Sequence, residues 1–75
     1  MRFSTWLWEQ LDDGTSLGRF ANICWKDVNN GCAHATFNAG QWLKHIKEHH
    51  AERADVLVPL LISAFHKYRI YLGLE

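Results

Sequence analysis

The fold class follows from one stretch of the chain, SLGRFANICWKDV, which occupies residues 16–28. Its apolar residues recur at the three- and four-residue spacing of one helical face rather than at the alternate positions of a strand. That face consists of Leu17, Phe20, Ala21, Cys24 and Val28. Ile23 and Trp25 widen it, so we expect this helix to be the most buried of the fold. Thr15 or Ser16 is suited to cap its first free amides.

Three further stretches carry apolar residues at the same helical spacing, over about residues 3–11, 38–50 and 55–72. Their apolar faces consist of Phe3, Trp6, Leu7 and Leu11 in the first, Trp42, Leu43, Ile46 and His50 in the second, and Leu57, Leu61, Ala64, Phe65, Tyr68 and Leu72 in the third. No segment sustains the alternation of a half-buried strand. Four short amphipathic helices with brief connections predict an all-α fold, a compact four-helix bundle around one core.

Turn and capping residues separate the predicted helices. Asp12 to Thr15 and Asn29 to Gly31 are turn sequences, because glycine accepts positive φ and Asp or Asn side chains bond nearby amides. Asn38 is suited to cap the third helix, and Gly73 to end the fourth. Pro59 fits the fourth helix within its first turn, or else marks a kink.

The composition is that of one folded domain spanning residues 1–75. Four Trp, four Phe and two Tyr supply a large apolar area for so short a chain. Eight basic and eight acidic residues leave no net charge at pH 7, so there is no bulk electrostatic argument for nucleic acid or an anionic membrane. The longest apolar stretch, Val56 to Phe65, contains Pro59 and is far shorter than the ~20 residues of a membrane helix.

The cellular location is predicted from the cysteines and from the first residues. Two cysteines are too few for a disulfide-rich secreted scaffold. The segment Met1 to Trp6 lacks the apolar run and the cleavage site of a signal peptide. We therefore expect a cytoplasmic protein whose thiols are both reduced.

The first two predicted helices carry a pattern beyond periodicity. It consists of Phe3-Ser4-Thr5-Trp6-Leu7, Gln10, Asp12-Asp13, Gly18-Arg19-Phe20-Ala21 and Asp27. In this pattern, in Trp42-Leu43-x-x-Ile46 and in the segment Asp55 to Tyr68, the chain resembles the YozE SAM-like family, small bacterial proteins of unknown function. The resemblance implies a sterile-alpha-motif-like helical bundle, and related bundles bind other proteins or nucleic acid. The chain departs from the family at Gly31-Cys32-Ala33-His34, where members often have an aromatic-Pro pair.

A metal hypothesis rests on Cys24, Cys32, His45 and His49, which are spaced C-x7-C-x12-H-x3-H. Structural zinc takes four Cys or His ligands in a tetrahedron, and the last two gaps match a zinc-finger spacing. The first gap is longer than the roughly two to four residues of such sites. Cys24 also belongs to an apolar face, where a free cysteine packs as a small hydrophobe. We therefore predict no cofactor, and these four residues form the alternative.

The candidate contact face lies on the third predicted helix and the turn that follows it. It consists of Trp42, Lys44, His45, Lys47, His49, His50 and Arg53. Basic groups beside an aromatic ring are typical of a nucleic-acid contact. However, Glu48 and Glu52 interrupt the basic run, and cations near a helix C-terminus also stabilise the helix dipole. We therefore expect another protein as the partner, with DNA as the alternative.

No catalytic constellation is found in the sequence. A Gly-rich phosphate loop is absent, and Ser4, Ser16 and Ser63 lack the surroundings of a nucleophile elbow. We expect a binding module that is not an enzyme and has no small-molecule substrate. The segment Ile70 to Leu74 is more apolar than one helical face requires. An alternative hypothesis is therefore that this segment forms a homodimer interface.

Overall fold

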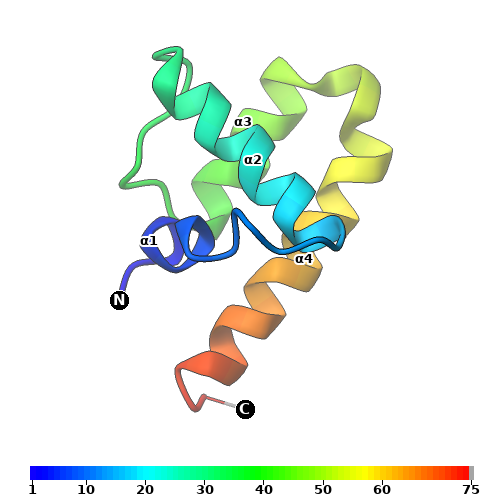
Figure 1. Cartoon of the computed structure of the whole chain (residues 1–75). Helices are drawn as coiled ribbons and strands as arrows, with labels where there is room; N and C mark the ends of the chain where they lie inside the picture. Colours follow the sequence, from blue (N-terminus) through cyan, green and yellow to red (C-terminus); the bar gives the residue numbers. More distant parts are fainter. Residues whose placement is uncertain (75) are drawn as a thin grey trace.

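The computed structural model describes residues 1–74 and confirms the all-α prediction. The elements are α1 (Phe3–Trp8), α2 (Ser16–Asn29), α3 (Ala39–His49), a short 3-10 helix η1 (Ala51–Arg53) and α4 (Ala54–Tyr71), as Figure 1 shows. Within the described residues there is no strand. No helix among them combines the length and the apolar character that a bilayer span requires.

The first helix is shorter than predicted. We expected it to reach Leu11, but α1 ends at Trp8. The amides of Glu9, Gln10 and Leu11 each bond the carbonyl three residues back, at 3.0, 2.9 and 3.4 Å. Such bonds tighten the last turn of a helix and end it. The chain then turns toward α2 earlier than the apolar spacing indicated.

The capping residues act as the sequence indicated. The Thr15 side chain accepts a hydrogen bond from the Leu17 amide at the start of α2. Asn38 and Gln41 form a reciprocal capping box at the start of α3, which satisfies two amides that the helix leaves free. At the end of α4, Gly73 has φ +78°, a conformation that favours glycine, and the Leu74 amide bonds the Arg69 carbonyl.

Pro59 lies inside α4 rather than in its first turn. The helix begins at Ala54, so the proline occupies its second turn, where it removes one backbone hydrogen bond. Residues 51–53 form η1 instead of extending α4 toward α3. The fourth helix therefore starts after a tight turn and contains its proline near the beginning.

The core lies where α4 crosses the other helices, because α4 contacts α1, α2 and α3. Its largest fully buried side chains include Leu7, Phe20, Trp42 and Leu57, one from each of the four α-helices. Figure 1 shows that the last turns of α4 project beyond the rest of the bundle. The final residues of this helix are therefore placed away from the core.

Candidate functional site

The structure corrects the predicted contact face on α3. Trp42 is 0% exposed and His45 only 4% exposed, so neither side chain is available to a partner on the surface. The Trp42 ring packs edge-on against Phe37, with centroids 5.2 Å apart, because the apolar face of α3 points into the core. Both residues were assigned to the surface, and that assignment is wrong.

The remaining residues of that face are at least partly accessible. Lys44, Lys47, His49 and Arg53 are exposed, and His50 is half-buried. Lys44 approaches Glu48 one turn later, with its Nζ 3.9 Å from the carboxylate. An exposed pair of this kind contributes little to stability. It does place a negative charge within the basic run, so this surface carries mixed charge.

The four residues of the zinc hypothesis do not form one site. Cys24 is buried in the core, and burial raises the pKa of its thiol, which disfavours the thiolate that binds zinc. Cys32 is exposed, and the two cysteines are not bonded to each other. His45 and His49 do meet, with rings stacked at a centroid distance of 4.6 Å. The four residues therefore do not form a Cys2His2 site, because Cys24 points into the core.

A different group of polar residues meets between α2 and the end of α3. We call Asp27, His45 and His50 the Asp–His cluster. Asp27 Oδ2 lies 2.8 Å from His45 Nε2 and 2.7 Å from His50 Nε2. A carboxylate only accepts hydrogen bonds, so each Nε2–H donates to the same oxygen. The three ligand atoms all lie within 4.8 Å of one another, and no other such group occurs among residues 1–74.

The charge state of Asp27 results from two opposing effects. Partial burial raises the pKa of its carboxyl, whereas the hydrogen bonds and the positive charge of His50 and His45 lower it. The net effect is a pKa below the ordinary value. Asp27 is therefore an ionised carboxylate at neutral pH, held in the space between two imidazoles.

Two helix ends create the Asp–His cluster. Asp27 lies in the last turn of α2, which is closed by Gly31 at φ +77° and by a bond from the Cys32 amide to the Asp27 carbonyl. His50 follows α3 as its C-cap, with φ −129° and ψ 38°, so its side chain leaves the helical path. Helical spacing pairs His45 with His49 in the sequence, whereas the contact of His50 with Asp27 depends on how α2 and α3 pack.

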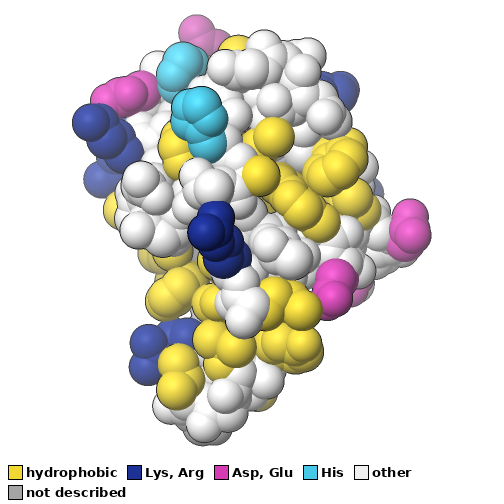
Figure 2. All heavy atoms as spheres, turned by 90° about the vertical axis from the view of Figure 1, so that its left-hand side faces the viewer, with side chains coloured by type: hydrophobic (Ala, Val, Ile, Leu, Met, Phe, Trp, Pro, Cys, Tyr) yellow, Lys and Arg dark blue, Asp and Glu magenta, His cyan; other side chains and the backbone are white. Residues whose placement is uncertain are grey.

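The last turn of α4 presents apolar side chains to solvent. We call the group Met1, Ile70, Tyr71, Leu72 and Leu74 the apolar end; its members are between 39% and 60% exposed. The Tyr68 hydroxyl donates to the Met1 carbonyl, and the Trp6 and Tyr71 rings lie 6.5 Å apart, which ties the first residues to α4. Figure 2 shows hydrophobic side chains around this projecting part of the molecule.

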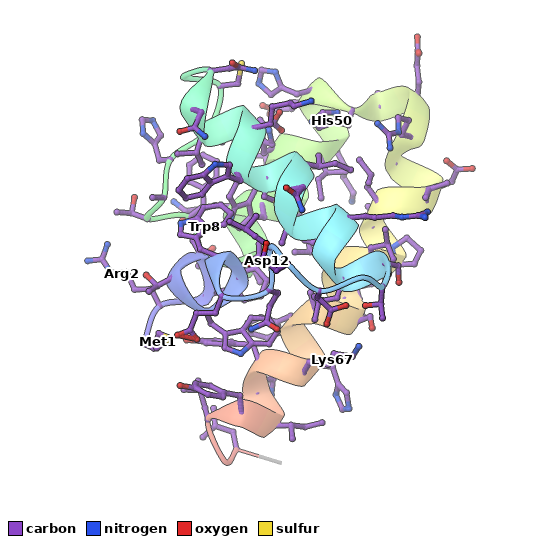
Figure 3. All side chains as sticks on the ribbon, viewed as in Figure 1. Met1, Arg2, Trp8, Asp12, His50 and Lys67 are labelled. Atoms are coloured by element: carbon purple, nitrogen blue, oxygen red, sulfur yellow. The ribbon has the colours of Figure 1, made fainter. Side chains whose placement is uncertain are left out.

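The apolar end and the Asp–His cluster are separate features. In Figure 3 His50 lies near the top of the view at the end of α3, and Met1 lies lower and to the left at the start of α1. A shallow hollow of about 200 Å³ lies between α3 and α4, lined by Leu43, Leu61, Ile62 and Phe65 among others. The Asp–His cluster, the apolar end and this hollow are thus three different features of the described surface.

The fold and these features define a small all-α helical bundle. No protein-family model, curated protein or solved structure matches the chain. The resemblance to the YozE SAM-like family therefore stays a prediction, and function has to be argued from the residues themselves.

Proposed function

We propose that the protein is a non-catalytic, cytoplasmic module that binds another protein through the apolar end. The observation that carries this proposal is the exposure of large apolar side chains in the last turn of α4 and just after it, where Ile70 is 52% and Leu74 is 60% exposed. Contiguous exposed apolar side chains mark interaction surfaces more often than scattered ones do. The buried residues of α4 are Leu57, Leu61 and Ala64, nearer its start, so the core does not include Ile70 or Leu74.

The chemistry of the apolar end favours a protein partner. Tyr71 offers a large ring with a hydroxyl, the kind of side chain that dominates protein–protein contacts. Nucleic acid is held mainly through its phosphates by Lys and Arg, whereas this surface is formed by apolar groups and the whole chain has no net charge. The complementary surface is an apolar groove on another protein, and a second copy of this chain is the alternative occupant.

The experiment compares charge insertion at two exposed isoleucines of α4. Ile70→Glu changes the apolar end, and Ile62→Glu makes the same change at a side chain that is 64% exposed but lies in the α3–α4 hollow. Partner capture by tagged protein and self-association by sedimentation are measured for both variants. We expect Ile70→Glu to weaken the interaction by about tenfold or more, as for a contact worth roughly 2 kcal/mol, and Ile62→Glu to have little effect.

Two controls decide between the alternatives. Both variants must melt close to the parent temperature, because both side chains lie outside the core. Lys44→Glu combined with Lys47→Glu tests the exposed part of α3. If this double variant abolishes capture while Ile70→Glu leaves it intact, the apolar end is not the interface. Salt-sensitive DNA binding that is lost in the double variant would favour the nucleic-acid hypothesis instead.

A further inference from the structure

We propose that the Asp–His cluster is a binding site for one divalent transition-metal cation of the zinc type, with Asp27, His45 and His50 as its protein ligands. The proposal is independent of the partner surface at the apolar end. It also differs from the Cys2His2 hypothesis, with which it shares only His45.

The donor set suits such an ion. Two imidazole nitrogens and one carboxylate oxygen form a three-ligand set that zinc accepts, with water at the fourth position. Both rings direct Nε2 at the same oxygen, Asp27 Oδ2, at 2.8 and 2.7 Å. Ligand atoms around a tetrahedral zinc with bonds of about 2.0–2.1 Å lie roughly 3.3 Å apart. The Asp27 oxygen therefore needs to move away from each imidazole nitrogen by only roughly half an ångström, and all three ligand atoms already lie within 4.8 Å of one another.

The electrostatic surroundings favour positive charge at this point. The last turn of α2 contains Asp27, and α3 ends at His49, just before His50. Helix C-termini carry a partial negative charge from their free carbonyls, so two such ends act on the cluster together. The Asp27 carboxylate adds a full negative charge. The two imidazole N–H groups hydrogen-bond to this carboxylate, and a cation would replace them.

The Asp–His cluster can be reached from the surface, although its side chains are partly or fully buried. A hollow of about 490 Å³ is lined by Asp27 and His50 among others, which provides a route for the ion and room for a water ligand. His50 is half-buried at its edge and His45 lies behind it, 4% exposed. Lys26 and Arg53 also line this hollow, but both are exposed, where solvent and salt screen their charge.

Binding requires no change in the fold. Each imidazole has to present a lone pair on Nε2, so the Nε2 proton leaves as the metal takes its place. In a neutral ring the proton moves to Nδ1, and a protonated ring releases it to solvent. The His45 ring is already fixed by its stack against His49 and by its edge-on packing at 5.6 Å against Trp42. One of the three ligands is thus oriented in advance, which lowers the ordering cost of binding.

The test is a titration of tag-free, chelator-stripped, reduced protein with zinc chloride, followed by calorimetry and by nitrogen-15 NMR of the histidine rings. We expect one ion per chain and zinc-dependent shifts of the Nε2 resonances of His45 and His50. His50→Ala and Asp27→Asn should each weaken binding by about tenfold or more, because each removes one ligand of three. Absence of one-to-one binding by the parent protein would overturn the proposal.

The control is a double variant of neighbouring exposed groups, Cys32→Ser with His34→Ala, which removes two surface donors but neither a proposed ligand nor the His49 ring that stacks on His45. It should retain zinc affinity within about threefold of the parent. If it loses zinc while His50→Ala retains it, binding belongs to the surface thiol and His34, and the proposed site is wrong. The ring resonances of the parent protein decide the question even if a ligand variant fails to fold.

Discussion

At the residue scale, the hydroxyl of Ser4 links three segments of the fold by hydrogen bonds that the sequence does not reveal. It is fully buried on α1; its Oγ accepts a hydrogen bond from Trp42 Nε1 and donates one to the Phe37 carbonyl, both at 2.9 Å. One hydroxyl thus joins α1, the segment before α3, and α3 itself. No buried side-chain nitrogen or oxygen among the described residues lacks a partner, so removing this hydroxyl creates a defect that the fold otherwise avoids.

Ser4→Ala should therefore destabilise the protein by about 1–3 kcal/mol, because it leaves a buried indole N–H without an acceptor. The adjacent Thr5→Ala is the matched control, since Thr5 is exposed on the same helix and alanine favours helix. Urea unfolding measures the free energy of unfolding of both variants. An unchanged midpoint for Ser4→Ala would show that the hydroxyl contributes nothing to stability.

At the element scale, the start of α2 depends on a close approach between backbone atoms. Gly18 lies in its first turn, and a Cβ placed there would be 1.7 Å from the carbonyl oxygen of Asp13. The turn before α2 thus packs directly on the helix, and no flexible side chain intervenes. Gly40 holds a similar place in the first turn of α3, but a Cβ there would meet only the Asn38 side chain, at 3.5 Å.

We expect substitution by alanine to have opposite effects on stability at the two glycines. Gly18→Ala should destabilise the protein by about 1–3 kcal/mol, the range for an overpacked site, even though alanine is the better helix former. Gly40→Ala should stabilise it by about 0.5–1 kcal/mol, because alanine loses less conformational entropy in a helix. Denaturant unfolding of both variants checks the pair. If both variants were stabilised equally, helix propensity, and not the contact with Asp13, would determine the outcome.

At the scale of the whole molecule, stability depends on a single small core. The Cα radius of gyration is 11.4 Å, and α4 contacts each of the other three α-helices. A domain of this size buries only about 60% of the surface that its unfolded chain exposes. No helix therefore has enough independent packing to persist when the others separate.

We accordingly expect one cooperative unfolding transition. Helix content followed by far-ultraviolet circular dichroism and packing followed by tryptophan fluorescence should give the same midpoint, as two-state unfolding requires. The tryptophans report on α1, α2 and α3, whereas circular dichroism also reports on α4. A separate early loss of helix signal would show that the projecting part of α4 unfolds independently of the core.

Local features of the sequence determined the helices. The spacing of apolar residues located all four α-helices, and Thr15, Asn38 and Gly73 marked their ends, because caps and stops act over only a few residues. The two exceptions, the early end of α1 and the place of Pro59 inside α4, lie at helix ends. Boundaries there depend on single hydrogen bonds rather than on periodicity.

Only the tertiary structure decided which polar residues meet. Asp27 lies 18 residues from His45 and 23 from His50, and Ser4 lies 38 from Trp42; no local pattern links residues so far apart. The surface of α3 was misjudged for the same reason, since Trp42 was assigned both to an apolar face and to a contact surface. Periodicity gives the direction of a side chain around its own helix, but burial depends on which neighbouring helices cover that direction, and this is fixed only when the helices pack.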